Sequence, residues 1–586
     1  MALLVAITPG VAAQAEAAAL SQQALASARM QGHGDPVLLT WTGGQAMWFD
    51  TPGNAGAAGA CLVEGSRFAA YVGTVHWRGL TRSALLRRLL EAGPDPASLP
   101  LRELAGSYTM LIGDAHRAWL FNDAVGLHKT YARSDRRLYS TSLLLCRSTL
   151  QRPRLNRLRA QEFVLLGANH ANETPLADIE VCDPTLALEL GTGSGVAVHR
   201  PEDWRQATPP ATFDQAVEQV ASSLLDDGRS MVSAFGSKIG MALSGGFDSR
   251  LILAVLDSLE VRPALYVYGR EGDADVQIAS AKAADLGLAI RCIDKSVLNA
   301  GQPAFDAAGL RASLGFFDGL PTDGVFDRGA DRLTRLLQVE GGTLNLNGGG
   351  GEILRNFFYI RDRAYTADEL VGVFYSNWVP QAVPSPEDRL ALRAALGSGI
   401  LACLGFDSNA AATTARRLSR SDVELVYSLY RLRYWMGRNN SVASRYGDFL
   451  TPLPHPGLVS LAARIPIRWK TYGQLESAVI NRLSPRVADG PSDYGFSFAS
   501  GPHLAHRMRL AGTLVRPVAL RRASTAIRHA LGRSAQARAP AEWTAALPDA
   551  EVDWIDVRYL SDTAQLNRLM TLRALLSPSF DPVAAA

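Results

Sequence analysis

With 586 residues the chain is too long for a single hydrophobic core, because such cores rarely grow beyond about 250–300 residues. Its 47% hydrophobic and 20% charged composition is ordinary for a soluble globular protein, and no apolar run reaches the roughly 18 residues of a membrane span. The net charge of +3 says little about partners. Five widely spaced cysteines without a CxxC pair suggest neither a zinc cluster nor a disulfide framework, and they fit a reducing, cytoplasmic setting.

Residues 1–205 are typical of an α+β layered domain. The opening stretch MALLVAI has the apolar run of a signal peptide but lacks a positive start, since the first basic residue is Arg29, so we interpret it as a first strand. Strands are predicted within 36–50, 66–77, 106–123 and 136–145, and residues 80–93 have the leucine spacing of a helix. The polar, proline-containing stretch 199–211 is predicted to be a linker.

Residues 206–586 are predicted to form a second domain. Thr212-Phe-Asp-Gln215 is a capping-box signature that opens a helix through Leu225. Strands at 239–243, 264–269 and 289–294 then alternate with helices, which predicts a parallel sheet with helices packed on it. The remainder is mainly helical. Residues 501–540 hold eight arginines and no acidic residue, and we interpret them as a solvated helical face or a surface for a partner or substrate.

The stretch Ser244-Gly-Gly-Phe-Asp-Ser249 lies between the apolar strand IGMAL and a helix beginning at Arg250. At such a turn the backbone N–H groups converge on a helix N-terminus, which favours an anion. Gly245 and Gly246 permit close approach of phosphate oxygens, and Ser244 and Ser249 add hydroxyl donors. Asp248 would repel a phosphate unless a cation lies between them, so the pattern predicts a bridging Mg²⁺. A glycine turn with an aspartate cap is the simpler alternative.

This stretch resembles the pyrophosphate loop of ATP-pyrophosphatases. The segments 101–143 and 172–190 resemble the glutaminase-like domain of asparagine synthetases, and the order of the two parts is that of the asparagine synthetase superfamily. The resemblance covers most of residues 1–500. It implies an Ntn-hydrolase-like (glutaminase-like) α+β domain, followed by an α/β adenine nucleotide alpha hydrolase-like, ATP-pyrophosphatase domain with a largely helical C-terminal part and a basic tail.

The resemblance fails at the glutaminase nucleophile. A working domain of this type exposes an N-terminal cysteine, whereas here the second residue is Ala2 and the nearest cysteine is Cys61. We therefore expect no ammonia release from glutamine, and a packed thiol rather than a displaced nucleophile at Cys61. β-Lactam synthetases and lasso peptide cyclases share this loss, and both join an amine and a carboxylate within one molecule.

The stretch Leu344-Asn-Leu-Asn-Gly-Gly-Gly-Gly-Glu352 resembles a second nucleotide motif of asparagine synthetases. The match implies that Asn347 and Gly348 lie by the ribose and α-phosphate, and that Glu352 replaces the second magnesium-binding aspartate. We expect the four glycines to leave room for a bulky acyl group. A flexible glycine loop is the alternative.

Relatives also carry a catalytic lysine shortly after a segment that 447–473 resembles, but here that place reads GQLESAVINRL. Only five of the 59 basic residues are lysine, and Lys470 is the last of them. Arg482, Lys470 and Arg438 are the candidates for the missing positive charge. Tyr472 and Glu476 are near enough in sequence to be further candidates.

The resemblance favours a lasso peptide cyclase. Such an enzyme adenylylates an Asp or Glu side chain of a precursor core peptide with ATP and Mg²⁺, closes an isopeptide (macrolactam) ring with the N-terminal amine, and works with a leader peptidase and a leader-recognition protein. Adenine is expected near Leu243 and Ala289. A small-molecule amide ligase such as a β-lactam synthetase, an ammonia-dependent asparagine synthetase-like enzyme and a non-catalytic scaffold remain alternatives. We expect no nucleic-acid partner, a hairpin turn at Gly191–Gly195, and a structural role for His455.

Overall fold

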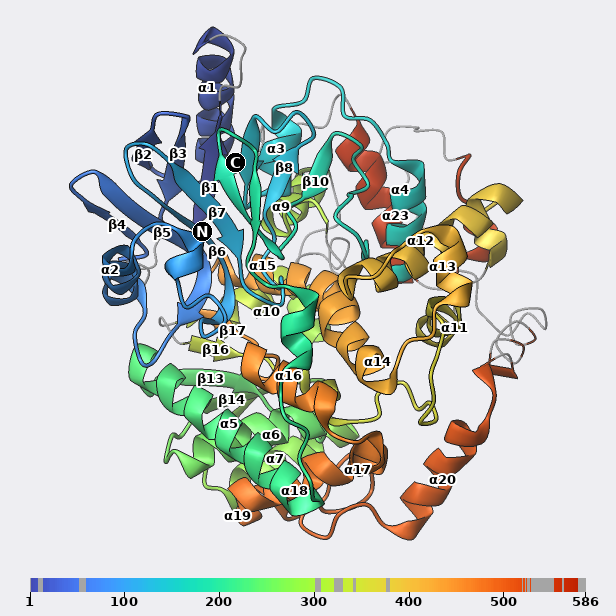
Figure 1. Cartoon of the computed structure of the whole chain (residues 1–586). Coiled ribbons are helices and arrows are strands. Elements are labelled where there is room, and N and C mark those ends of the chain that lie inside the picture. Colours follow the sequence, from blue (N-terminus) through green and yellow to red (C-terminus); the bar gives the residue numbers. More distant parts are fainter. Residues whose placement is uncertain are drawn as a thin grey trace.

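Two antiparallel sheets in the N-terminal part and one parallel sheet further along organise the chain (Figure 1). The structure is a computed structural model, and it describes residues 2–8, 14–51, 59–300, 307–320, 330–340, 344–375, 380–518, 520, 521, 523, 527, 553–560 and 563–577. Mixed α/β content with this order of sheets confirms the coarse fold expected from the sequence.

The first sheet has the order β10-β8-β9-β1-β3-β2, and the second has the order β12-β11-β7-β6-β5-β4. Their strands are β1 (Leu3–Ile7), β2 (Val37–Trp41), β3 (Gly44–Phe49), β4 (Cys61–Glu64), β5 (Arg67–His76), β6 (Ala105–Gly113), β7 (Ala118–Asn122), β8 (Tyr131–Arg133), β9 (Leu138–Ser140), β10 (Ile179–Val181), β11 (Leu186–Leu190) and β12 (Gly195–Ala197). The turn between β11 and β12 is the hairpin predicted at Gly191–Gly195.

Strand β1 is buried on both faces, which explains why its sequence is continuously apolar. Leu3, Val5 and Ile7 belong to a core shared with α1 (Gln14–Met30) and α3 (Leu143–Ser148). Ala2, Leu4 and Ala6 belong to the core between the two sheets. Because successive side chains of a strand point to opposite faces, the pattern fits a central strand sandwiched between two layers.

One predicted strand is partly a helix. Residues 143–145, at the end of the predicted strand run 136–145, begin α3. Ser142 caps this helix by accepting a hydrogen bond from the Leu145 N–H (3.2 Å). The Asp318 carboxylate accepts hydrogen bonds from the Ser142 hydroxyl (2.6 Å) and the Leu143 N–H (2.8 Å), so a distant residue also fixes the helix start.

The parallel sheet has the order β15-β14-β13-β16-β17, formed by β13 (Ile239–Ala242), β14 (Ala264–Tyr268), β15 (Ile290–Ile293), β16 (Leu344–Leu346) and β17 (Phe449–Leu450). Helices α5 (Phe213–Phe235), α6 (Phe247–Ser258), α7 (Ala274–Asp285) and α18 (Gln474–Leu483) lie along it in the lower half of Figure 1. Thr212 caps α5 as predicted, but the helix continues to Phe235, ten residues beyond the predicted end.

The other helices are α2 (Arg82–Ala92), α4 (Arg157–Leu166), α8 (Lys295–Ala300), α9 (Ala307–Phe316), α10 (Ala330–Gln338), α11 (Ala367–Phe374), α12 (Pro386–Cys403), α13 (Ala410–Ala415), α14 (Arg420–Val426), α15 (Gly437–Ser444), α16 (Pro456–Arg464), α17 (Ile467–Lys470), α19 (Pro485–Ala488), α20 (Leu504–Val515) and α23 (Thr563–Leu576). A ten-residue π-helix, η6 (Tyr427–Met436), continues α14 into α15, and 3₁₀ turn η4 (Gly351–Leu354) follows β16.

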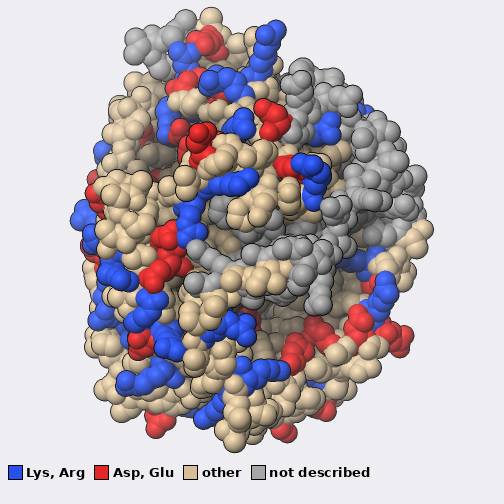
Figure 2. Space-filling view, turned by 90° about the vertical axis from the view of Figure 1, so that its right-hand side faces the viewer, with Lys and Arg blue, Asp and Glu red and all other residues tan. Residues whose placement is uncertain are grey.

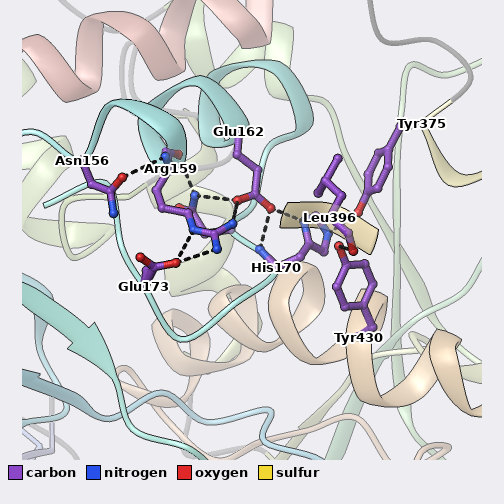
Figure 3. A network of polar contacts seen from close by, with 9 residues as sticks. Asn156, Arg159, Glu162, His170, Glu173, Tyr375, Leu396 and Tyr430 are labelled. Carbon is purple, nitrogen blue, oxygen red and sulfur yellow. Dashed lines mark hydrogen bonds and ion pairs between the residues drawn. The ribbon is translucent and has the colours of Figure 1, made fainter. Parts of the chain in front are cut away.

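A buried polar network connects α4 to η6 and to the end of α11 (Figure 3). Glu162 accepts hydrogen bonds from Arg159 (2.7 Å) and lies 3.0 Å from the Nδ1 atom of His170. The other ring nitrogen of His170 lies 2.9 Å from the Tyr375 hydroxyl, and the ring stacks on Tyr430 of η6 at 4.8 Å between centroids. Since these partners lie on both sides of residue 205, the two predicted domains share buried polar contacts as well as one apolar core.

Charged side chains of both signs are interspersed over the face shown in Figure 2. The charge on the described part of this face therefore does not indicate a polyanionic partner. No helix among the described residues is both long and apolar enough to cross a membrane.

Candidate functional site

The loop between β13 and α6 is a tight turn at the carboxyl edge of the parallel sheet, as predicted. The hydroxyls of Ser244 and Ser249 lie 2.9 Å apart, and the Ser244 N–H donates to the Ser249 hydroxyl (3.0 Å). The Gly245 N–H donates to a carboxylate oxygen of Asp275 (2.6 Å), and the Gly246 N–H donates to the Ser244 hydroxyl (3.2 Å). Three backbone donors thus converge on one turn, each bonded to an oxygen of the protein.

Gly245 has to be glycine for a steric reason. A Cβ atom at this position would lie 2.0 Å from a carboxylate oxygen of Asp493, which follows α19. The Asp493 N–H donates to the Gly245 carbonyl (3.1 Å). The 491–493 segment also accepts a hydrogen bond at the Pro491 carbonyl from the buried guanidinium of Arg250 in α6 (2.9 Å). The loop is therefore closely packed on its outer side.

Glu352 reaches the same edge from the neighbouring strand, since β13 and β16 pair in parallel. Its carboxylate accepts hydrogen bonds from the Tyr427 hydroxyl (2.6 Å) and the Gly350 N–H (3.1 Å). The Asn347 side chain accepts a hydrogen bond from the Gly349 N–H (2.6 Å), so Asn347 shapes this loop. Gly348 packs against Asp248, whose Cβ would lie 3.3 Å from a Cβ placed on the glycine.

The expectation that four glycines leave open space is wrong. A Cβ atom at Gly349 would lie 2.5 Å from the Cε of Met436, and one at Gly350 would lie 2.7 Å from Pro454. At Gly351 it would lie 2.4 Å from a carboxylate oxygen of Asp248. The glycine run is therefore a packed loop, and its missing side chains allow the loop after β16 to approach Asp248 closely.

Arg355 joins the two loops, and sequence reasoning missed it. Its guanidinium donates to Asp248 (2.7 Å), lies 4.0 Å from Glu352 and 3.2 Å from Glu476 of α18, and donates to the Tyr494 hydroxyl (3.1 Å). Its position three residues after Glu352 is the one sequence signal that could have identified it. We call Asp248, Glu352, Arg355, Tyr427 and Glu476 the carboxylate cluster.

Burial dominates the electrostatics of the carboxylate cluster. It raises the pKa of Asp248 to about 6, and Arg355 opposes this shift. Burial also raises the pKa of Glu476 well above its usual range, again against Arg355, and it raises the pKa of Tyr427. An added positive charge in this acidic, desolvated place would favour the ionised carboxylates.

The donor chemistry of the cluster fits a magnesium ion that arrives with a ligand. Asp248 and Glu352 offer carboxylate oxygens from adjacent loops, which is the ligand type that Mg²⁺ prefers. No group of three or more His, Cys, Asp or Glu side chains able to hold a metal ion occurs among the described residues. Because Mg²⁺ commonly takes its remaining ligands from phosphates and water, two carboxylates suffice for a metal–nucleotide complex.

The basic residues predicted to be catalytic have partners outside the carboxylate cluster. Lys470 is fully buried and lies 2.6 Å from Glu424, and burial lowers its pKa. Arg482 is exposed on α18 and pairs with Glu218 (2.9 Å). Arg438 donates to the Gly167 carbonyl (2.9 Å). Within the carboxylate cluster the positive charge belongs to Arg355.

The structure does not bring the two predicted adenine residues together. Leu243 is buried just beyond the carboxyl end of β13. Ala289 immediately precedes β15 and lines a cavity of about 590 Å³ with Gly240, Ala264 and Tyr266. In the parallel register Met241 and Ile290 both pair with Leu265. Leu243 comes two residues after Met241, and Ala289 comes one residue before Ile290, so the two lie toward opposite ends of their strands.

The structure also shows the surroundings of several other residues that the sequence analysis named. Cys61 is half-buried in β4, and burial raises the pKa of its thiol to about 12, which disfavours a thiolate nucleophile. His455 caps α16 by accepting a hydrogen bond from the Leu458 N–H (3.4 Å). Tyr472 has a left-handed backbone (φ 67°) where η7 (Thr471–Gly473) leads into α18, which carries Glu476. Of the basic stretch 501–540, only 501–518, 520, 521, 523 and 527 lie among the described residues.

No protein-family model matches the chain, and no curated protein matches it. Two solved structures show a distant likeness. The glutamine phosphoribosylpyrophosphate amidotransferase from B. subtilis, complexed with ADP and GMP, has a TM-score of 0.22 and 12% identity over 50% of this chain and 66% of its own. A structure described as the allosteric regulatory enzyme of purine biosynthesis has a TM-score of 0.22 and 12% identity over 56% of this chain and 78% of its own. Similarity at this level assigns neither a family nor an activity.

Proposed function

We propose that the protein is an AMP-forming amide ligase that uses ATP and Mg²⁺ to cyclise a peptide, as a lasso peptide cyclase does. One observation carries the proposal. The turn at 244–249 and the loop ending at Glu352 follow adjacent parallel strands, and the carboxylates of Asp248 and Glu352 both lie near Arg355 in one partly exposed cluster. Ligands of open α/β sheets bind at this carboxyl edge. The residues there are the types that bind phosphate through a metal ion.

In the proposed reaction, a carboxylate oxygen of an Asp or Glu side chain of the peptide attacks the α-phosphorus of ATP. The bond from that phosphorus to its bridging oxygen breaks, and pyrophosphate leaves. The peptide's N-terminal amine then attacks the acyl carbon and gives up a proton to solvent, the acyl–oxygen bond breaks, and AMP leaves as the isopeptide ring closes. Holding the amine and the acyl carbon together replaces a bimolecular step with an intramolecular one.

The chain's own residues would bind and orient the nucleotide. The turn at Ser244, Gly245 and Gly246 opens α6, whose N-terminus favours phosphate, and the Ser244 and Ser249 hydroxyls add donors. The three backbone N–H groups of this turn are bonded to oxygens of the protein and would exchange those partners for phosphate oxygens when the nucleotide binds. Asp248 and Glu352 would hold Mg²⁺, which supplies charge neutralisation at the phosphates when bound. The packing around Gly245 and Gly351 limits how far either loop can move.

The test is release of AMP and pyrophosphate from ATP in the presence of candidate precursor peptides, with ring formation followed by the mass loss of one water. We expect activity in the wild type and a loss of about 100-fold or more in Asp248→Asn and Glu352→Gln. Asp226→Asn removes one exposed carboxylate from α5 and is the matched control, with activity unchanged.

The alternatives give different results in the same assay. AMP formation with a small amino acid instead of a peptide would identify a small-molecule ligase, and amide formation from aspartate and ammonium would identify an asparagine synthetase-like enzyme. A wild-type protein that never forms AMP from ATP with any acid would contradict the proposal and would favour the alternative of a non-catalytic scaffold.

A further inference from the structure

The carboxylate cluster contains its own cation. Asp248, Glu352 and Glu476 all carry carboxyl groups, and Arg355 is the basic residue that lies within 4.0 Å of each. Burial acts to lower the pKa of Arg355, but the neighbouring acids, Asp248 and Glu476 foremost, outweigh it and hold that pKa above its usual value, so the guanidinium keeps its positive charge. The site therefore neutralises part of its negative charge before any ligand binds.

The three acids differ in how accessible they are. The side chains of Asp248 and Glu352 are 20% and 22% exposed, whereas that of Glu476 is 0% exposed. Glu476 also lies on α18, which packs along α5 and α6, while Asp248 lies in the first turn of α6 and Glu352 lies in η4. A ligand arriving from solvent can reach Asp248 and Glu352, but it cannot reach Glu476.

This difference predicts an exchange of partners at Arg355. When a divalent cation binds Asp248 and Glu352, it replaces the guanidinium of Arg355 as the positively charged partner of those two carboxylates. Glu476 stays paired with Arg355 and holds it at the edge of the site, with guanidinium N–H groups free to face the ligand. A guanidinium matches the oxygens of a phosphate in a bidentate geometry.

We propose that Arg355 binds the nucleotide's phosphate oxygens directly and that Glu476 is the residue that positions it. This inference rests on the proposed function, because it supplies the positive charge for that reaction. It also accounts for the stretch GQLESAVINRL, which has an acid at Glu476 and no lysine. In this chain the cation and its buried acidic partner come from two different elements, the loop after β16 and helix α18.

The test uses Arg355→Met, Arg355→Lys and Glu476→Gln, with Arg482→Met as the matched control because Arg482 pairs with an exposed carboxylate outside the cluster. Binding of the non-cleavable analogue α,β-methylene-ATP with Mg²⁺ is measured by calorimetry. We expect Arg355→Met to weaken binding about tenfold or more, Arg355→Lys to recover part of it, and the control to bind like the wild type.

A second measurement separates this role from a structural one. Binding of Mn²⁺ without nucleotide, followed by electron paramagnetic resonance, should become tighter in Arg355→Met, because a competing cation is removed from Asp248 and Glu352. It should become weaker in Glu476→Gln, because Arg355 then pairs more closely with those two acids. A merely structural loss would weaken Mn²⁺ binding in both variants.

Unchanged analogue binding in a folded Arg355→Met variant overturns the inference, as does weaker Mn²⁺ binding in that variant. If the methionine variant does not fold, Arg355→Lys serves as the test, because it keeps the positive charge but loses the planar guanidinium. Binding of Mn²⁺ and of the analogue at the wild-type level in Arg355→Lys would contradict direct phosphate binding by the guanidinium. A wild-type protein that binds the analogue but forms no AMP with any acid would instead remove the proposed function alone.

Discussion

At the residue scale, single polar contacts decide how each carboxylate behaves. Tyr427 donates its hydroxyl proton to Glu352 at 2.6 Å, and its ring packs against Phe357 at 5.0 Å between centroids. Tyrosine here thus combines a packing role with one directed hydrogen bond. No periodicity or motif in the sequence distinguishes Tyr427 from the other tyrosines of its segment, so this contact depends on the fold.

Tyr427→Phe should keep the fold and lower turnover by about tenfold, because the ring remains while Glu352 loses the donor that orients it. AMP formation and the thermal midpoint of unfolding measure the two effects. Tyr430→Phe is the matched control, since its hydroxyl donates to the Leu396 carbonyl, away from Glu352. Equal losses of turnover in both variants would contradict the orienting role.

Asp227 gives a pH-dependent prediction outside the site. It lines a small apolar cavity with Leu224 and Met231, and its carboxylate lies 3.7 Å from His76. Burial raises the pKa of Asp227 to about 7 and lowers the pKa of His76 to about 3, so the histidine stays neutral between pH 5 and 8. The folded protein therefore keeps a proton on Asp227 that the unfolded chain releases near pH 4.

This contribution to stability is fully present below about pH 4 and is lost as the pH rises through about 7. Asp227→Asn cannot lose that proton, so its advantage over the wild type should grow from pH 5 to pH 8. At about 1.4 kcal/mol per pKa unit, the difference at pH 8 is on the order of 1–4 kcal/mol. Thermal midpoints across this range measure it, and a difference that does not change with pH would refute the assignment.

At the scale of elements, η6 connects the candidate site to the buried network of Figure 3. Tyr427 at its start reaches Glu352, and Tyr430, one turn later, stacks on His170. π-Helical segments often occur at functional sites. Here the wider turn places aromatic side chains of one helix against two separate polar clusters.

Glu162→Ala should destabilise the protein by about 3–5 kcal/mol, because it leaves His170 buried without its carboxylate and Arg159 paired with Glu173 alone. The Glu162 side chain is 0% exposed. Glu173→Ala is the matched control: it also removes a carboxylate from Arg159, but its side chain is 55% exposed, so we expect a loss within about 1 kcal/mol. Chemical denaturation measures both, and similar losses would show that burial of Glu162 contributes little.

Elements with local signals were predictable, and those fixed by distant contacts were not. The strand and helix on either side of residues 244–249 follow from apolar patterning and two glycines, so Asp248 could be placed from sequence. Helix α3 depends on Asp318, and the glycine run at 348–351 depends on Met436, Pro454 and Asp248, none of which a local pattern reveals. Arg355 was missed because its three acidic partners come from three separate segments.

At the scale of the whole molecule, the chain folds back on itself. The C-terminal helix α23 lies beside α4 (Figure 1), and one apolar core includes residues from Leu3 to Leu575. Arg147 donates to the Leu575 carbonyl (3.0 Å) and the Ser577 carbonyl (3.2 Å), and Arg568 donates to the Val164 carbonyl (2.9 Å). Residues 1–205 therefore depend on the far end of the chain for part of their burial.

This arrangement predicts that a chain ending at Leu560 is strongly destabilised. The truncation removes the buried side chains of Leu569, Leu572 and Leu575, each worth about 2–5 kcal/mol, and exposes the apolar face of α4. We expect a thermal midpoint lower by about 10 °C or more, or insoluble protein. A chain ending at Ser577 keeps α23 and both Arg147 contacts, and it is the reference with which the shorter chain is compared. If the shorter chain is as stable as the longer one, the core does not depend on α23, and residues 1–205 are the more independent unit.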